Sequence, residues 1–141
     1  MHINPPINFT LLIDDDKVIN FYNEKIVNKH QDFINVVAVN SGMKALEYLN
    51  NAILGLTKKP NLIFLDINMP AMNGWEFIEE YDKLDKAFTS SIKIILLTTS
   101  NNPDDFERYK TIDLLEDFIN KPLSDSLLTN LIESHYKEKI I

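Results

Sequence analysis

Cysteine is missing from the 141-residue sequence, which excludes a disulfide, a thiolate nucleophile and a cysteine-based metal site. Its absence fits a reducing compartment, so we expect a cytoplasmic protein. Long hydrophobic runs are missing as well, because the best apolar stretch, residues 92–97, contains Lys93. No membrane partner is therefore predicted. The N-terminus also lacks a basic stretch followed by an apolar one, which argues against a signal peptide.

Basic residues are scarce relative to acidic ones: 14 lysines and arginines stand against 21 aspartates and glutamates, for a net charge of -7. This balance argues against nucleic acid as a partner, because binding a phosphate backbone needs a basic surface. It suits carboxylates that bind a metal cation, or an acidic surface that only aids solubility. No Gly-x-x-x-x-Gly-Lys segment occurs, so a nucleotide-binding P-loop is not expected.

The length of the chain fits one domain, and no internal repeat is present. We expect a single domain over residues 1–141 with a core at about 7–137. Few residues follow the last expected helix, so no output domain is predicted.

Short apolar runs alternate with apolar residues at helical spacing along the chain. The runs predict strands at 9–13, 34–39, 62–65, 92–97 and around 118–119. Five helices are expected between and after them, on Val18, Phe21, Tyr22 and Ile26; on Leu46, Leu49 and Ile53; on Phe77, Ile78, Tyr81 and Leu84; on Phe106 and Tyr109; and on Leu127, Leu128, Leu131, Ile132 and Tyr136. Residues 55–61 are predicted to form a loop.

This alternation predicts an α/β fold with right-handed βαβ units and a parallel sheet covered on both faces. In such open sheets, ligands bind beyond the carboxyl ends of the strands. The residues that follow the predicted strands therefore matter most: Asp14, Asp15 and Asp16, then Asp66, then Thr98, Thr99 and Ser100, then Lys121 and Pro122.

Aspartates end two of these strands. Asp14 and Asp15 follow the first strand and Asp66 follows the third, and neighbouring carboxylates resist full ionisation unless a cation neutralises them. Hard divalent cations such as Mg²⁺ use one or two carboxylates and keep several waters. The aspartates could instead cap the first helix, a role that we assign to Asp16.

A hydroxyl and a cation follow the fourth and fifth strands, at Thr98 and Lys121. A carboxylate, a metal, a hydroxyl and a lysine can together surround a phosphoryl group, whose transfer needs mainly positioning and charge neutralisation. Asp66 is the natural nucleophile, because carboxylates form acyl phosphates.

Four segments resemble, in the family's order, the receiver domains of two-component response regulators. They are Leu-Leu-Ile-Asp-Asp-Asp at 11–16, Leu-Asp-Ile-Asn-Met-Pro with Asn-Gly at 65–74, Leu-Thr-Thr-Ser at 97–100 and Asn-Lys-Pro-Leu at 120–123. The resemblance spans nearly the whole chain. It implies a flavodoxin-like, doubly wound (βα)5 fold with a five-stranded parallel sheet in the order 2-1-3-4-5.

The resemblance also implies roles. Asp66 matches the phosphorylated aspartate, Thr98 and Lys121 match the groups that bind the phosphoryl oxygens, and Phe118 falls at the aromatic switch position. Asp14, Asp15 and Asp66, with the backbone carbonyl of Asn68, would bind Mg²⁺ or Mn²⁺. The Lys121–Pro122 peptide is expected to be cis.

The expected partners are a sensor histidine kinase or histidine phosphotransfer protein as donor and an unidentified downstream protein. A homodimer could form through the face built by the helix at Phe106 and Tyr109, the strand at Phe118 and the last helix. The chain would be a signalling phosphoacceptor and not an enzyme acting on other substrates.

Two other functions are weighed against this one. A haloacid-dehalogenase type phosphatase would carry a second aspartate two residues after the nucleophile, where this chain has Asn68. A degenerate receiver would lack part of the acceptor set, which is complete here. Phe118 has no hydroxyl, Thr99 is larger than is common at its position, and the glycine often found before the fifth strand is missing. His2, His30 and His135 are predicted to be surface residues without metal ligation.

Overall fold

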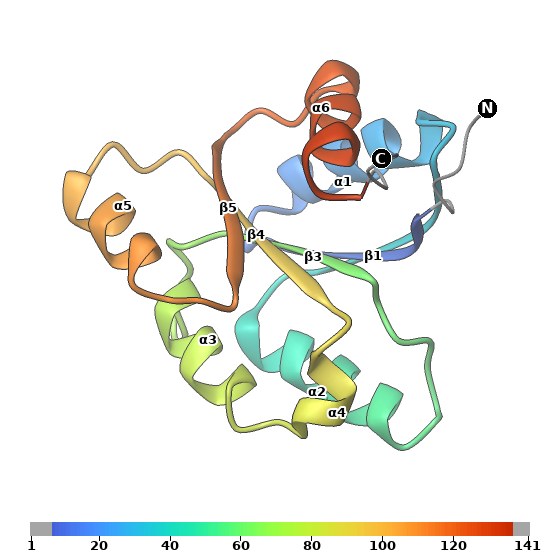
Figure 1. The fold of residues 1–141 in the computed structure, drawn as a ribbon, viewed down its shortest axis with the longest axis vertical. Helices are drawn as coiled ribbons and strands as arrows, with labels where there is room; N and C mark the ends of the chain where they lie inside the picture. The colour runs from blue at the N-terminus through green and yellow to red at the C-terminus, as the bar shows by residue number, and fades with distance from the viewer. Residues whose placement is uncertain (1–6, 137–141) are drawn as a thin grey trace, which may run out of the picture.

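The computed structural model describes residues 7–136. Five parallel strands form one sheet in the order β2-β1-β3-β4-β5, which confirms the predicted fold class and strand order (Figure 1). His2, most of the N-terminal segment and the last residues of the chain lie outside the described part. The strands are β1 (Ile7–Ile13), β2 (Phe33–Val39), β3 (Leu62–Leu65), β4 (Lys93–Thr98) and β5 (Leu115–Asn120).

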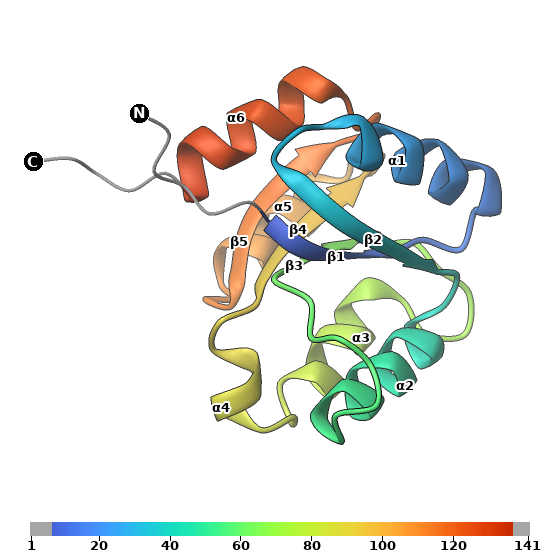
Figure 2. The same ribbon diagram turned by 90° about the vertical axis from the view of Figure 1, so that its right-hand side faces the viewer.

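Helices cover both faces of the sheet (Figures 1 and 2). Helices α1 and α6 lie on one face, whereas α2, α3 and the one-turn α4 lie on the other, with α5 beside the β5 edge. Within residues 7–136, no helix is long and apolar enough to cross a membrane. The helices are α1 (Lys17–Lys29), α2 (Gly42–Ile53), α3 (Gly74–Tyr81), α4 (Lys86–Thr89), α5 (Pro103–Lys110) and α6 (Asp125–His135).

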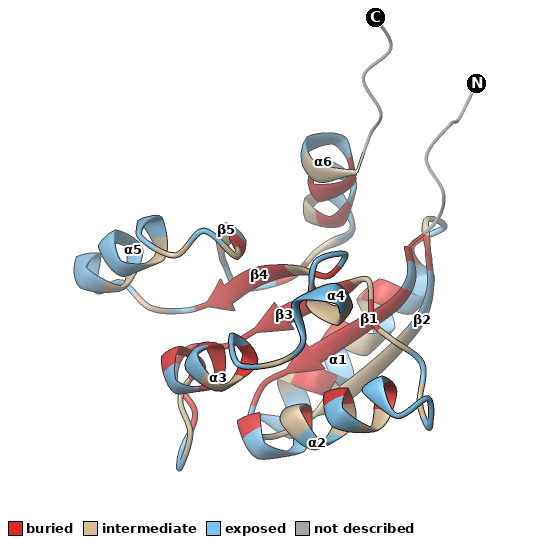
Figure 3. Cartoon of the chain, turned by 60° about the horizontal axis from the view of Figure 1, so that its bottom comes forward, coloured by how far each residue is buried: buried red, intermediate tan, exposed pale blue. Residues whose placement is uncertain are grey.

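The central strands read as continuous apolar runs because both of their faces are covered. All four residues of β3 are buried, and Figure 3 shows the buried colour running along the middle of the sheet. One cluster of buried side chains packs between the sheet and α2 and α3, and a second packs between the sheet and α1 and α6. The two clusters hold the carboxyl ends of β1, β3 and β4 side by side.

The first helix lies where it was predicted, but of the four apolar residues that indicated it only Ile26 packs against the core. Val18, Phe21 and Tyr22 are exposed, at 77%, 61% and 48%. The buried residues of α1 are instead Asn20, Asn23 and Val27. Apolar residues on a surface are common, so spacing alone could not tell which face points inward. The exposed apolar face of α1 is therefore open to a partner.

The third helix is shorter than predicted, and a sixth helix follows it. Helix α3 ends at Tyr81, and the Asp85 side chain caps α4 by accepting a hydrogen bond from the Ala87 amide. Leu84 lies between the two helices and still packs against the core. The predicted loop at 55–61 contains neither helix nor strand, and Gly55 adopts a positive φ of 79° just after α2.

Candidate functional site

Three aspartates meet at the carboxyl ends of β1 and β3. These strands pair in parallel with Ile13 opposite Leu65, so the residues that follow them lie side by side. The Asp66 amide donates to the Ile13 carbonyl at 3.0 Å, which fixes the backbone at this edge. One carboxylate oxygen from each of Asp14, Asp15 and Asp66 lies within 4.8 Å of the others. The structure thus brings together the predicted acidic cluster.

Two of these carboxylates are buried and one is exposed. Asp14 is 4% exposed and Asp66 is 6% exposed, whereas Asp15 faces solvent. Burial, together with the negative charges of Asp14 and Asp15, raises the pKa of Asp66 to about 6, and the nearby Lys121 ammonium only partly opposes this rise. The ionised form of Asp66 is therefore disfavoured in this site, first by burial and then by the neighbouring carboxylates.

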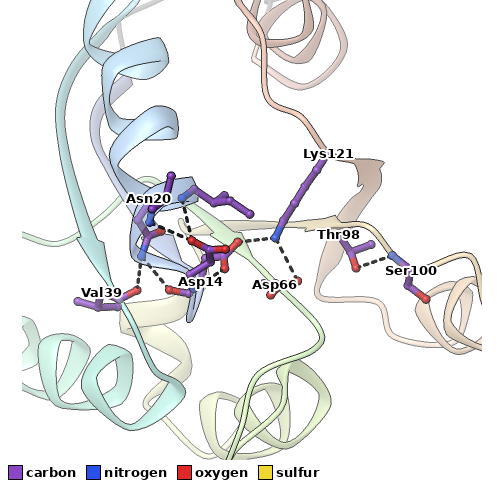
Figure 4. A network of polar contacts seen from close by, with 10 residues as sticks. Asp14, Asn20, Val39, Asp66, Thr98, Ser100 and Lys121 are labelled. Carbon is purple, nitrogen blue, oxygen red and sulfur yellow. Dashed lines mark hydrogen bonds and ion pairs between the residues drawn. The ribbon is translucent and has the colours of Figure 1, made fainter.

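Lys121 reaches this cluster from the end of β5. Its Nζ forms an ion pair with Asp14 Oδ2 and lies 3.5 Å from Asp66 Oδ1 (Figure 4). The Lys121 amide donates to the Thr98 carbonyl at 2.9 Å, which ties the ends of β4 and β5 together. The Lys121–Pro122 peptide is cis, as predicted. A single ammonium therefore faces both buried carboxylates.

Thr98 ends β4 and is fully buried. Its Oγ1 accepts a hydrogen bond from the Ser100 amide at 3.1 Å, as the dashed line in Figure 4 marks. Thr99, which follows it, is exposed. The hydroxyl is thus near the cluster but is engaged elsewhere.

Asn20 on α1 supports the cluster and was missed by the sequence-based prediction. Its Nδ2 donates to the Asp14 carbonyl at 2.7 Å and to the Val39 carbonyl at 3.2 Å, which joins the ends of β1 and β2. Asn20 is 5% exposed. A polar residue at helical spacing beside three aspartates was the available signal, but only apolar residues had been used to orient this helix.

The turn at Asn73 and Gly74 packs directly on the backbone of Asp66. Asn73 caps α3 and forms a reciprocal pair of hydrogen bonds with Glu76. A Cβ on Gly74 would lie 2.7 Å from the Asp66 carbonyl oxygen, so a side chain cannot fit without moving the backbone. The glycine is needed for this close approach.

Other predicted residues fall around the cluster. Asp16 caps α1, as expected, by accepting hydrogen bonds from the Val18 and Ile19 amides. Asn68 is exposed in the turn after β3. Phe118 on β5 is half-buried and contacts the rings of Phe106 and Tyr109 on α5, with centroids 5.4 and 5.6 Å away. The roles assigned to Asn68 and Phe118 stay predictions.

The expectation for the histidines was wrong at His30. This residue is only 5% exposed, its Nε2 lies 2.9 Å from Thr129 Oγ1, and its Nδ1 accepts from the Asp32 amide. These bonds explain why a polar ring is stable between α1 and α6. His135 is also partly buried, with Nε2 3.0 Å from Asp117 Oδ2.

The donor set fits a hard divalent cation. Three carboxylates converge with one ammonium, and cations such as Mg²⁺ prefer oxygen ligands from few protein groups. Among the described residues, this is the one cluster of acidic and histidine side chains close enough to hold a metal ion.

With fold and cluster established, comparison with known families places the chain. It belongs to the response regulator receiver domain family, whose model matches residues 10–133. Receiver domains are signalling phosphoacceptors of two-component systems, which bind a divalent metal and act with histidine kinases and downstream effectors.

Similar proteins agree with this family. A two-component response regulator from Cytophaga hutchinsonii is 32% identical with a TM-score of 0.82, over 92% of this chain and 96% of that one. The structure of the Mn²⁺-bound form of response regulator Rcp1 is 25% identical with a TM-score of 0.70, over 96% of this chain and 98% of that one.

One curated relative is much longer than this chain. A probable cyclic di-GMP phosphodiesterase of Vibrio cholerae is 30% identical over 132 residues, which is 92% of this chain but 27% of the relative. The shared part is thus about a quarter of that protein, and the likeness concerns the receiver portion alone.

Proposed function

We propose that this receiver domain accepts a phosphoryl group on Asp66 from a phosphohistidine, with Mg²⁺ or Mn²⁺ bound, and thereby changes a face that contacts other proteins. The observation that carries the proposal is the position of the Asp66 carboxylate. It is buried, lies 3.5 Å from the Lys121 ammonium, and belongs to a cluster with two further carboxylates. Such a carboxylate is a nucleophile whose surroundings can neutralise a phosphoryl group.

In the proposed transfer, a carboxylate oxygen of Asp66 bonds to phosphorus while the bond from phosphorus to the donor imidazole nitrogen breaks. The imidazole keeps that electron pair and takes a proton from solvent. Lys121 is placed to pair with a phosphoryl oxygen, and the Thr98 hydroxyl can donate to another after it turns from Ser100. These groups act by position and charge, which is what phosphoryl transfer requires.

The metal ligands in this proposal are Asp14, Asp15 and Asp66 with the backbone carbonyl of Asn68. When bound, the cation neutralises the charge that the carboxylates and the phosphoryl oxygens bring together. Burial, and after it the negative charge of Asp14, raises the pKa of Asp66 to about 6, so a bound cation would offset a charge that is costly in this site. The likeness to the Mn²⁺-bound form of Rcp1 supports it as well.

The proposed phosphodonor is a sensor histidine kinase or a histidine phosphotransfer protein. A groove of about 440 Å³ lies beside the cluster, lined by Val18, Ile19, Tyr22, Asn23, Thr99, Lys121 and Pro122. It combines the exposed apolar face of α1 with the lysine that touches Asp66. A helical surface seated on this face would bring its phosphohistidine toward Asp66, and a cytoplasmic location fits this exchange.

The proposed output face contains α5, β5 and α6. Phe118 contacts Phe106, which is 44% exposed, so a change in the position of Phe118 would alter the surface of α5. Thr98 and Phe118 are the proposed switch residues. The downstream protein, or a second copy of the chain, would bind this face.

Phosphorylation by acetyl phosphate or phosphoramidate with Mg²⁺ tests the proposal. Intact-mass spectrometry should show one added phosphoryl group in the wild type and in Asp16→Asn, which changes only the cap of α1. Asp66→Asn should add none, because an amide is a poor nucleophile. Equal labelling of Asp66→Asn would refute the assignment.

Calorimetry tests the metal site separately. Wild type should bind Mg²⁺ with modest affinity, because few protein ligands are available. An Asp15→Ala, Asp66→Ala double variant should lose this binding, whereas Asp104→Ala, on the exposed side of α5, should retain it. Binding of unchanged affinity in the double variant would contradict the site.

A further inference from the structure

A continuous path of hydrogen bonds links the Thr98 hydroxyl to the indole of Trp75. The Ser100 amide donates to Thr98 Oγ1 at 3.1 Å, and the Ser100 hydroxyl donates to Asp105 Oδ2. The other oxygen of that carboxylate, Asp105 Oδ1, accepts from Trp75 Nε1 at 3.2 Å. One side chain on α5 therefore holds the loop after β4 with one oxygen and helix α3 with the other.

Both ends of this path are firmly placed. Thr98 is fully buried, and Trp75 is only 7% exposed. The guanidinium of Arg108, one turn after Asp105, lies 4.9 Å from the centre of the indole ring. The middle of the path is less buried, since Ser100 and Asp105 are partly exposed. The bonds most easily broken are therefore those made by Asp105.

The path also constrains the direction of the Thr98 hydroxyl. While Asp105 holds the Ser100 side chain, the Ser100 amide stays hydrogen-bonded to Thr98 Oγ1 (Figure 4). A phosphoryl group on Asp66 would draw the Thr98 hydroxyl toward it, and that turn would lengthen the hydrogen bond that Thr98 Oγ1 accepts from the Ser100 amide. The bonds to Asp105 oppose that turn.

We propose that Asp105 is a positioning residue that holds Thr98, through Ser100, in the orientation that disfavours contact with the phosphoryl group. The proposal rests on the function proposed above. Releasing Asp105 lowers the cost of turning Thr98 and frees the loop after β4 and the start of α5 from α3. Trp75, as the fixed partner at the other end, reports whether Asp105 is in place.

A capping role for Asp105 must be separated from this one. Asp105 lies in the first turn of α5, where a negative charge stabilises the helix, but Asp104 lies in the same turn. Asp104 is exposed, and its carboxylate makes no hydrogen bond within the part of the chain that the structure describes. Asp104→Ala therefore removes the same charge from the same helix turn without touching the path.

Binding of beryllofluoride, a phosphoryl mimic, with Mg²⁺ measures the cost of turning Thr98. Asp105→Ala should bind it about threefold to tenfold more tightly than wild type, the range that the net energy of one hydrogen bond allows. Ser100→Ala should shift the affinity in the same direction and carries the same test if Asp105→Ala does not fold. Affinities equal to or weaker than that of Asp104→Ala would overturn the proposal.

The single indole N–H resonance gives a second readout, because Trp75 is the only tryptophan. Beryllofluoride should shift this resonance in wild type and leave it unchanged in Thr98→Ala, where the hydroxyl is absent. In Asp105→Ala it should be displaced before any addition. An equal shift in wild type and Thr98→Ala would contradict the path. If wild type binds no beryllofluoride at all, the proposed function fails, whereas normal binding with unchanged variants rejects only the role of Asp105.

Discussion

Helices α3 and α5 have the same length and opposite surroundings. Each spans eight residues, yet α3 buries five of them and α5 buries none. Figure 3 shows this contrast, with the buried colour on α3 and the exposed colour around α5. The contacts of α5 are made largely by partly exposed rings, such as those of Phe106 and Tyr109. The centroids of these two rings lie 5.7 Å apart.

This difference gives the two helices different roles: α3 supports the site at Asp66, whereas α5 can be displaced. Helix α3 begins at Gly74, packed on the Asp66 backbone, and its buried side chains hold that end of the sheet. Helix α5 follows the loop after Thr98 and has few buried contacts that resist displacement. Local opening costs least where few apolar contacts are buried, so α5 should move more easily than α3.

The largest expected contrast is between two phenylalanines. Phe77 on α3 is fully buried, so Phe77→Ala should lower the free energy of unfolding by about 3–5 kcal/mol. Phe106 on α5 is 44% exposed, so Phe106→Ala should lower it by less than about 1 kcal/mol. Urea denaturation measures both values. Similar losses in the two variants would contradict the comparison.

A smaller effect is expected at the cluster that α3 supports. The pKa of Asp66 is raised from 3.8 to about 6, so the protonated form stabilises the fold below about pH 4, and that contribution is lost as the pH rises through about 6. Asp66→Asn should therefore raise the unfolding free energy at pH 7 by at most about 3 kcal/mol.

Thermal unfolding followed between pH 4 and pH 7 checks this prediction. The difference in unfolding free energy between Asp66→Asn and wild type should increase as the pH rises. Adding Mg²⁺ should reduce this difference at pH 7 by stabilising only the wild type. A gap that does not depend on pH would show that the charge of Asp66 is not the cause.

The smallest expected effect concerns the cation that bridges the two helices. Arg108 on α5 lies over Trp75 and 3.7 Å from Glu79 on α3. Because Arg108 is half-exposed, Arg108→Ala should cost about 0.5 kcal/mol and speed amide exchange in α5. The Lys110 ammonium interacts with Phe106 and Glu107 of its own helix, so Lys110→Ala should leave the amide exchange in α3 unchanged. Equal exchange in the two variants would rule out the bridge.

The sheet and the cluster could be predicted because their signals are local and strong. Buried parallel strands read as unbroken apolar runs, and their carboxyl ends must meet at one edge. The juxtaposition of Asp14, Asp66, Thr98 and Lys121 follows from that topology. The chemical roles of these residues were carried by the likeness to a family and remain to be measured.

The errors arose where polar residues are buried or apolar residues are exposed. The Asn20 amide nitrogen and the His30 ring are stabilised inside by hydrogen bonds that include partners distant in the sequence, Val39 and Thr129, which no local pattern reveals. Val18 and Tyr22 are exposed, so the apolar spacing that located helix α1 does not mark its buried face. The bonds of Asp105 to Ser100 and Trp75 join two helices and likewise leave no local signal.

The most direct test of the account compares amide shifts in α3 and α5 when beryllofluoride and Mg²⁺ are added. Residues 99–110, in the loop after β4 and in α5, should shift strongly, as should the amides next to Asp66. Residues 77–81, in the buried part of α3, should remain nearly unchanged. Shifts confined to the neighbourhood of Asp66, with residues 99–110 unaffected, would contradict the claim that occupation of this carboxylate is read out through α5.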